Sequence, residues 1–106
     1  MIFEALKEAA ERGELMLING GLCRWHLRRD GTITIREILS TKPGAGRLML
    51  RRLGALARRL QASAIVARCP ADLKEANEWY HKMGFCLERT LKAKTGRRLH
   101  EWHCRL

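Results

Sequence analysis

Two glycines flank an alanine at Gly44-Ala45-Gly46, and Lys42 and Arg47 carry positive charge on either side. A predicted helix begins here, and the first backbone N–H groups of a helix have no partner within it. The helix dipole adds partial positive charge at this end, and glycines leave room for an anion to approach. The segment predicts a phosphate site, although the pattern by itself is more typical of a tight turn. It is neither a P-loop nor a dinucleotide fingerprint.

The neighbouring elements place this loop between a strand and a helix. Apolar and polar residues alternate over 32–39, which predicts a strand. Residues 64–67 are almost all apolar, as expected of a strand covered on both faces. Strand, loop, helix and strand then form a βαβ unit with parallel strands and a right-handed connection. The buried stripe of the helix is expected to be Met49, Leu53, Leu56 and Leu60.

The alternation breaks near the end of the first of these strands. Ile38 and Leu39 are adjacent apolar residues, and Arg36 and Glu37 interrupt the apolar phase before them. A β-bulge accounts for both departures. A bulge leaves backbone groups unpaired, so we expect another partner to satisfy them.

The rest of the chain adds strands and helices around this unit. The predicted order is α-β-β-β-α-β-α-β-β, an α+β fold with one mixed α/β sheet in a single domain over 1–106. The remaining predicted elements are a helix over 2–12, strands over 15–18 and 23–27 with Cys23, Trp25 and Leu27 on the buried face, a helix over 72–83 with Asp72 as N-cap, and a hairpin over 85–93 and 97–106.

Composition and charge limit the class of protein. No segment approaches the roughly 18 consecutive apolar residues of a membrane span, and the first residues lack the pattern of a signal peptide, so we expect a cytoplasmic protein without a membrane partner. The net charge of +10 favours a polyanionic partner. Nucleic acid and a phosphate-bearing cofactor both fit, as does a basic surface without a partner.

Cysteine and histidine spacing does not indicate a metal site. Four cysteines are present without a CxxC pair, and we expect them to be reduced, small buried hydrophobic residues. His100 and His103 lie three residues apart on a predicted strand, so their side chains face opposite sides. The sequence therefore predicts no metal.

Two segments resemble the GNAT N-acetyltransferases. Residues 41–46 resemble the family's pyrophosphate loop, Q/R-x-x-G-x-G/A, with Thr41 in place of the first Gln or Arg. Residues 76–85 resemble its A-x-x-x-Y-x-x-x-G-F segment through Tyr80, Gly84 and Phe85. The resemblance covers roughly residues 20–106. It implies a GNAT-like acyl-CoA N-acyltransferase fold with acetyl-CoA as co-substrate.

The resemblance also implies roles for particular residues. Tyr80 would give a proton to the leaving thiolate, unless it is a core aromatic residue on the helix face of Leu73, Ala76 and Met83. Glu37 would be the base, unless it is an exposed glutamate paired with Arg36 or Arg28. A backbone N–H near Leu39 would stabilise the oxyanion. The implied cofactor-binding residues are Ile38, Leu39, Ser40, Thr41, Lys42, Gly44, Ala45, Gly46, Arg47 and Asn77.

The resulting hypothesis is an N-acetyltransferase acting on an amine of a small molecule or a protein. Many GNAT domains begin with a strand and two helices, whereas one helix occupies that space here. A homodimer could complete the acceptor wall. Two alternatives stay open: a non-catalytic acetyl-CoA-binding or interaction module, and a basic nucleic-acid-binding domain. The last is disfavoured because the tryptophans and Tyr80 form no aromatic ladder on one strand.

Overall fold

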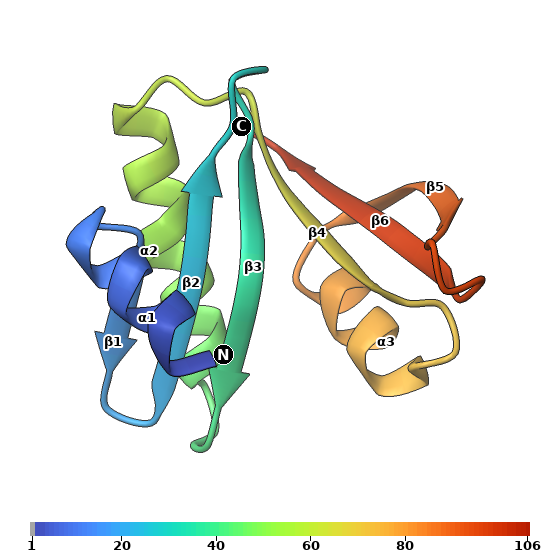
Figure 1. Ribbon diagram of the computed structural model, residues 1–106, viewed down its shortest axis with the longest axis horizontal. Helices are drawn as coiled ribbons and strands as arrows, with labels where there is room; N and C mark the ends of the chain where they lie inside the picture. The colour runs from blue at the N-terminus through green and yellow to red at the C-terminus, as the bar shows by residue number, and fades with distance from the viewer. Residues whose placement is uncertain (1) are drawn as a thin grey trace.

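A computed structural model describes residues 2–106 and confirms the predicted order of elements. Within residues 2–106, three helices and six strands follow one another in one mixed fold, and Figure 1 shows their arrangement. The elements are α1 Ile2–Glu11, β1 Leu15–Ile18, β2 Gly21–Leu27, β3 Ile33–Ser40, α2 Ala45–Arg59, β4 Ala64–Pro70, α3 Lys74–Lys82, β5 Cys86–Lys92 and β6 Arg98–Arg105.

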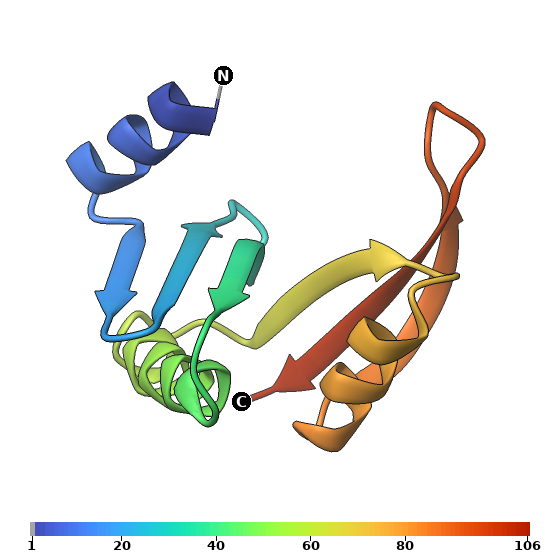
Figure 2. The same ribbon diagram turned by 90° about the horizontal axis from the view of Figure 1, so that it is seen from below.

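All six strands belong to one sheet in the order β1-β2-β3-β4-β6-β5. Among the strands of the described chain, β3 and β4 pair in parallel and the other neighbouring strands are antiparallel. Because β6 runs antiparallel to both β4 and β5, those two strands are parallel to each other. Helix α2 connects β3 to β4, and helix α3 connects β4 to β5; both connections move toward the β5 edge of the sheet. Because such connections between parallel strands are right-handed, both helices lie on the same face. Figure 2 shows α2 and α3 on that face and α1 on the other.

The parallel pairing of β3 and β4 is short. It runs from Ile33 opposite Ile65 to Ile35 opposite Ala67, and then the strands diverge (Figure 1). In the pairing of β2 with β3, the register shifts so that Arg36 has no partner on β2. The predicted β-bulge is therefore confirmed, and it lies where β3 leaves β4.

Helix α2 packs on the sheet through a stripe shorter than the predicted one. Met49 and Leu53 are fully buried, and each contributes roughly 2–3 kcal/mol through the apolar surface it removes from water. Leu56 is only partly buried, and Leu60 is 41% exposed because the helix ends at Arg59. Ala57 occupies the third buried position, one turn after Leu53. The prediction was correct for the first half of the helix and wrong for Leu60.

Three further local predictions were wrong. Helix α3 begins at Lys74 with Leu73 at its N-cap, and the Asp72 carboxylate instead lies 3.2 Å from Arg97 Nη2. Leu27, the last residue of β2, is 38% exposed. Cys86 is exposed, whereas Cys23 and Cys69 are buried as expected.

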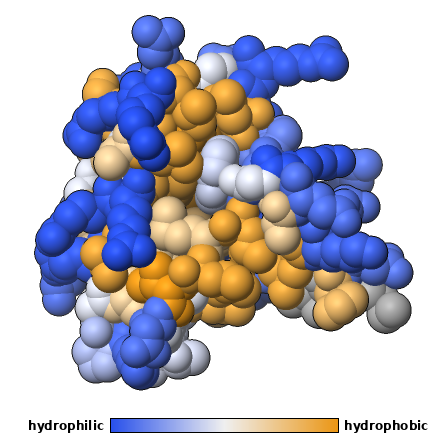
Figure 3. Space-filling view, turned by 90° about the vertical axis from the view of Figure 1, so that its left-hand side faces the viewer, coloured by the Kyte–Doolittle hydropathy of each residue, from blue (hydrophilic) through white to orange (hydrophobic). Residues whose placement is uncertain are grey.

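The side of the molecule that carries α1, β1 and α2 has a large apolar area between polar margins (Figure 3). Exposed apolar side chains on these elements are Phe3, Leu17 and Leu48. No helix within residues 2–106 is long and apolar enough to cross a bilayer.

A carboxylate is buried on the face of β6 opposite α3. The Glu101 side chain is 4% exposed and accepts hydrogen bonds from Arg68 Nε at 2.8 Å and Arg89 Nε at 3.1 Å, while His103 Nε2 lies 2.8 Å from its Oε1. Burial raises the pKa of Glu101, but the hydrogen bonds from His103, Arg89 and Arg68 outweigh it and lower the pKa to about 2. The cluster stabilises the pairing of β4, β6 and β5.

This cluster predicts a loss of stability in acid. The pKa of Glu101 in the folded chain lies below its unfolded value of about 4.3, so the stabilisation is present above that pH and is lost as the pH falls through about 2. We expect the free energy of unfolding to fall by on the order of 2 kcal/mol over this range, allowing for solvent screening of the half-exposed arginines. Urea denaturation at a series of pH values measures this fall in the free energy of unfolding. Glu101→Gln should flatten this dependence and Glu88→Gln should not; equal pH slopes in both variants would refute it.

Candidate functional site

The loop before α2 presents free backbone donors. Gly44 has a φ of +81°, a left-handed conformation that favours glycine, and it turns the chain into the helix. The Ala45 N–H donates to the Lys42 carbonyl at 3.2 Å, and the Leu48 N–H donates to the Gly44 carbonyl at 3.0 Å. The N–H groups of Gly46 and Arg47 have no acceptor within residues 2–106. The positive end of the helix dipole is therefore open to an anion, as the sequence predicts.

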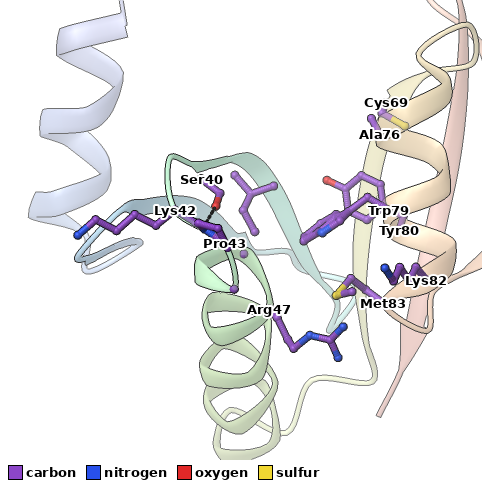
Figure 4. A pocket seen from close by; sticks show the side chains of 13 residues that line it. Ser40, Lys42, Pro43, Arg47, Cys69, Ala76, Trp79, Tyr80, Lys82 and Met83 are labelled. Carbon is purple, nitrogen blue, oxygen red and sulfur yellow. Dashed lines mark hydrogen bonds between the residues drawn. The ribbon is translucent and has the colours of Figure 1, made fainter.

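The preceding residues are tied to the turn between β1 and β2. The Thr41 N–H donates to the Gly20 carbonyl at 2.8 Å, and the Thr41 hydroxyl faces the same carbonyl at 3.3 Å. The Ser40 hydroxyl donates to the Lys42 carbonyl at 2.9 Å (Figure 4). Lys42 Nζ donates to Asn19 Oδ1 at 2.9 Å. These contacts fix the loop while its amides face outward.

A cavity of about 510 Å³ opens between this loop and α3, where β3 and β4 diverge. Arg47 projects beside it from α2, whereas the Lys42 side chain points away from it toward Asn19 (Figure 4). Trp79, Tyr80 and Lys82 project from α3 on the other side, together with Met83 at the C-cap of that helix (Figure 4). The predicted site residues that line it are Ile38, Ser40, Lys42, Gly44, Gly46, Arg47 and Tyr80. Those that do not are Glu37, Leu39, Thr41, Ala45 and Asn77. Sequence reasoning did not select Pro43, Cys69, Ala76, Trp79, Lys82 and Met83, which also line the cavity.

Tyr80 joins the hydrophobic core to this cavity. Its ring stacks edge-on with Trp79 at 5.2 Å and with Phe85 at 5.3 Å between ring centroids, and the residue is 7% exposed. The hydroxyl makes no hydrogen bond to any described residue, and it turns toward the cavity (Figure 4). Burial raises the pKa of Tyr80 to about 12, so the phenol carries its proton at neutral pH. Tyr80 is therefore both a core aromatic residue, as the alternative interpretation expects, and a residue that lines the cavity.

Glu37 lies outside the cavity. Its Oε1 accepts hydrogen bonds from Arg24, with Nη2 at 2.7 Å and Nε at 3.0 Å. Neighbouring residues of a strand point to opposite faces, so Ile38 lines the cavity and Glu37 projects from the other side. Arg24 also borders a separate cavity under α1. The partner of Glu37 is thus neither Arg36 nor Arg28, and its role as a base stays a prediction.

Asn77 is fully engaged in bonds within the protein. Its Nδ2 donates to the Pro70 and Leu73 carbonyls at 3.0 and 2.8 Å. Its Oδ1 accepts from Trp102 Nε1 at 2.9 Å and lies 2.8 Å from His100 Nδ1. The structure places Asn77 as the tie between α3, β4 and β6. A single sequence gives no signal for such a tie, because it depends on residues far apart in the chain.

His100 and His103 point to opposite faces of β6, as predicted. His100 contacts Asn77 on the α3 side, and His103 contacts Glu101 on the other side. Among residues 2–106 no group of three or more His, Cys, Asp or Glu side chains is placed to hold a metal ion.

The fold matches solved acetyltransferase structures. A Bacillus anthracis protein described as a candidate streptothricin acetyltransferase, solved with acetyl coenzyme A, superposes with a TM-score of 0.81 at 14% identity over 95% of this chain and 68% of its own. A Desulfovibrio desulfuricans protein described as a candidate acetyltransferase of the GNAT family gives 0.80 at 18% identity over 96% and 77%. Ribosomal-protein-alanine N-acetyltransferase of Brucella melitensis gives 0.75 at 18% over 99% and 76%.

The chain therefore has the GNAT acyl-CoA N-acyltransferase fold. The agreement lies in the fold rather than in the sequence. No family model matches the sequence, and no curated protein matches it.

Two glycines of α2 provide a matched test of the contact at the mouth of the cavity. A Cβ at Gly46 would lie 2.8 Å from Trp79 Cζ2, whereas one at Gly54 would meet nothing within 4 Å. We expect Gly46→Ala to lower the free energy of unfolding by about 1–2 kcal/mol through overpacking. Gly54→Ala should raise it by up to about 1 kcal/mol through better helix propensity. Thermal or urea denaturation measures both, and two changes of the same sign would contradict this packing.

Proposed function

We propose that this protein is an acetyl-CoA-dependent N-acetyltransferase that moves an acetyl group to an amine of a small molecule or a protein. The main support is the cavity, which is bordered by the free backbone N–H groups at the start of α2, by the diverging strands β3 and β4, and by the Tyr80 hydroxyl. The match to acetyltransferase folds supports the same conclusion, and the Bacillus anthracis protein was solved with acetyl coenzyme A.

The pyrophosphate of acetyl-CoA would bind at the start of α2. The N–H groups of Gly46 and Arg47 would donate to its oxygens, and the Arg47 guanidinium would neutralise its charge. Lys42, whose ammonium donates to Asn19, would add positive potential from the loop. Beyond Ile35, the edge of β3 that faces β4 has no strand partner in the described chain. The amides of the pantetheine arm would pair with this edge from Ile38 to Ser40, which gives the bulge its function.

The chemistry requires three groups around the thioester. The neutral amine attacks the carbonyl carbon, so a C–N bond forms and the C–S bond breaks. A backbone N–H near Leu39 would stabilise the oxyanion. Tyr80 would give its proton to the leaving sulfur, and a base would take the proton of the amine. Glu37 is the predicted base and would act through water, because its side chain lies on the other face of β3.

The acceptor is limited only by charge. With a net charge of +10, the protein would repel a polyamine, so an acceptor with a single amine or with acidic neighbours is favoured. The homodimer expected from the sequence stays a prediction; β1 is an edge strand, and Leu17 on it is 66% exposed.

Calorimetry with acetyl-CoA tests the binding site. We expect Arg47→Ala to weaken acetyl-CoA affinity by about tenfold, because one charge-assisted contact to a phosphate contributes on the order of 1.5 kcal/mol. Arg59→Ala is the control, since Arg59 is exposed on the same helix and lines neither this cavity nor the adjoining one. Absence of acetyl-CoA binding in the unmodified protein, or equal effects of the two substitutions, would count against this site.

Thiol release in the presence of a panel of amines tests the reaction. We expect Tyr80→Phe, which keeps the ring and removes the hydroxyl, to lower kcat by about 10²-fold with little change in KM for acetyl-CoA. The pKa of about 12 further predicts that ionisation of Tyr80 causes no loss of rate below about pH 11. Undiminished turnover by Tyr80→Phe would exclude it as the acid. Binding of acetyl-CoA without turnover of any amine would favour the non-catalytic module.

A further inference from the structure

The two edges of the sheet differ in how they are protected. Strand β5, at one edge, carries Glu88, Arg89 and Lys92. Charged residues of this kind keep a sheet edge from pairing with another chain. Strand β1, at the other edge, has the sequence Leu-Met-Leu-Ile, with no charged residue and no proline. No strand of residues 2–106 lies beyond it (Figure 1). The β1 edge is therefore open to a further strand.

The backbone groups of β1 alternate in direction. The Trp25 N–H donates to the Glu14 carbonyl at 3.0 Å, which fixes the phase of the pairing between β1 and β2. Successive residues of an antiparallel pair turn their backbone groups alternately toward and away from the partner strand. Met16 therefore turns its groups toward β2, and Leu15 and Leu17 turn theirs outward. These outward N–H and C=O groups have no partner within residues 2–106.

Apolar side chains continue this edge onto α1. One flank of α1 faces β2 and β3, where Glu8 and Arg12 line a small cavity. By helical spacing, Phe3, Leu6 and Ala10 lie on the opposite flank, which faces the open edge. Phe3 is 74% exposed. This apolar flank belongs to the side of the molecule on which Figure 3 shows the large apolar area.

We propose that a second copy of this chain pairs its β1 with this edge in antiparallel orientation, so that the two sheets become one continuous sheet. The two-fold axis of this dimer runs perpendicular to the sheet, and both copies of α1 lie on the same face. The inference goes beyond the proposed function, because none of the residues that form this edge or the apolar flank of α1 lines the cavity assigned to acetyl-CoA.

The side chains determine the register of this pairing. Opposing side chains of a sheet lie on the same face, so the axis passes through a residue rather than between two. An axis at Met16 places Leu15 of one copy opposite Leu17 of the other. Every outward-facing backbone group of both strands then has a partner, and the Leu17 side chain, 66% exposed in a single copy, packs against Leu15. The two α1 helices run antiparallel, with the bulky Phe3 of one toward the small Ala10 of the other.

Charge favours a second copy as the occupant of this edge. The net charge of the chain is +10, so two copies repel each other over most of their surfaces. Strand β1 carries no charge, and the charged residues of α1 are mainly acidic: Glu4, Lys7, Glu8 and Glu11. Two copies can therefore approach through this side without the repulsion between basic surfaces. A polyanion such as nucleic acid has no attraction to the same side.

Sedimentation equilibrium at moderate salt over a range of protein concentrations tests the interface. We expect the unmodified chain to dimerise and Leu17→Lys to raise the dimer dissociation constant by about tenfold or more, because it places a charge on the edge. Leu87→Lys is the matched control and should leave the dimer intact, since Leu87 is 48% exposed on β5 at the other edge. Circular dichroism checks that both variants fold. A monomeric unmodified chain, or equal effects of the two substitutions, would overturn the proposal.

Amide hydrogen exchange followed by NMR tests the register. We expect the N–H groups of Leu15 and Leu17 to exchange more slowly as the protein concentration rises, whereas exchange at Met16, which already bonds to β2, should change little. A dimer without this protection would place the interface elsewhere and overturn the proposal. A monomer that binds phosphatidylcholine vesicles and loses this binding with Leu17→Lys would overturn it in favour of a membrane surface. Neither measurement uses acetyl-CoA, so failure of acetyl-CoA binding would contradict the proposed function and leave the dimer standing.

Discussion

The divergence of β3 and β4 after three paired positions is the constraint on which the site depends. Up to Ile35 the two strands satisfy each other's backbone groups, and beyond it they cannot. The unpaired residue Arg36 alters the twist of β3 at this point. The two halves of the sheet remain joined by the pairing of residues 33–35 with 65–67, and α2 packs on one half and α3 on the other. The opening between them is therefore part of the fold and requires no movement to form.

The half that carries α3 is held by polar contacts as well as by apolar packing. Asn77 connects α3 to the end of β4 and to Trp102 on β6: its Nδ2 donates to the Pro70 and Leu73 carbonyls, and its Oδ1 accepts from Trp102 Nε1. Below it, Tyr80 packs between Trp79 and Phe85. On the opposite face, Glu101 of β6 forms ion pairs with Arg68 of β4 and Arg89 of β5. The position of the Tyr80 hydroxyl thus depends on a few buried hydrogen bonds and on one aromatic cluster.

Local patterns in the sequence predicted the order of elements, the parallel pairing and the bulge. Those features depend on periodicity, glycine position and a break in alternation, all of which are visible within about ten residues. The contributions of Trp79, Lys82 and Cys69 to the cavity were missed because they depend on how α3 and β4 lie against α2. The pairing of Glu37 with Arg24 was missed for a related reason, since the bulge at Arg36 changes which residues oppose each other. The start of α3 was misplaced by two residues, and the Asp72 carboxylate pairs with Arg97 of the final hairpin, a contact between residues far apart in the chain.

The contact between Gly46 and Trp79 has a consequence for how the sequence can change over generations. A methyl group at position 46 has no room while an indole occupies position 79. The reverse order is open, because a smaller side chain at position 79 would first create the space that a larger residue at position 46 needs. Substitutions at the two positions are therefore epistatic. If the larger residue at position 46 comes first, the intermediate protein is strained; if the smaller residue at position 79 comes first, it is not. The glycine at position 46 is therefore constrained by its neighbour on α3 as well as by any anion that binds at the start of α2.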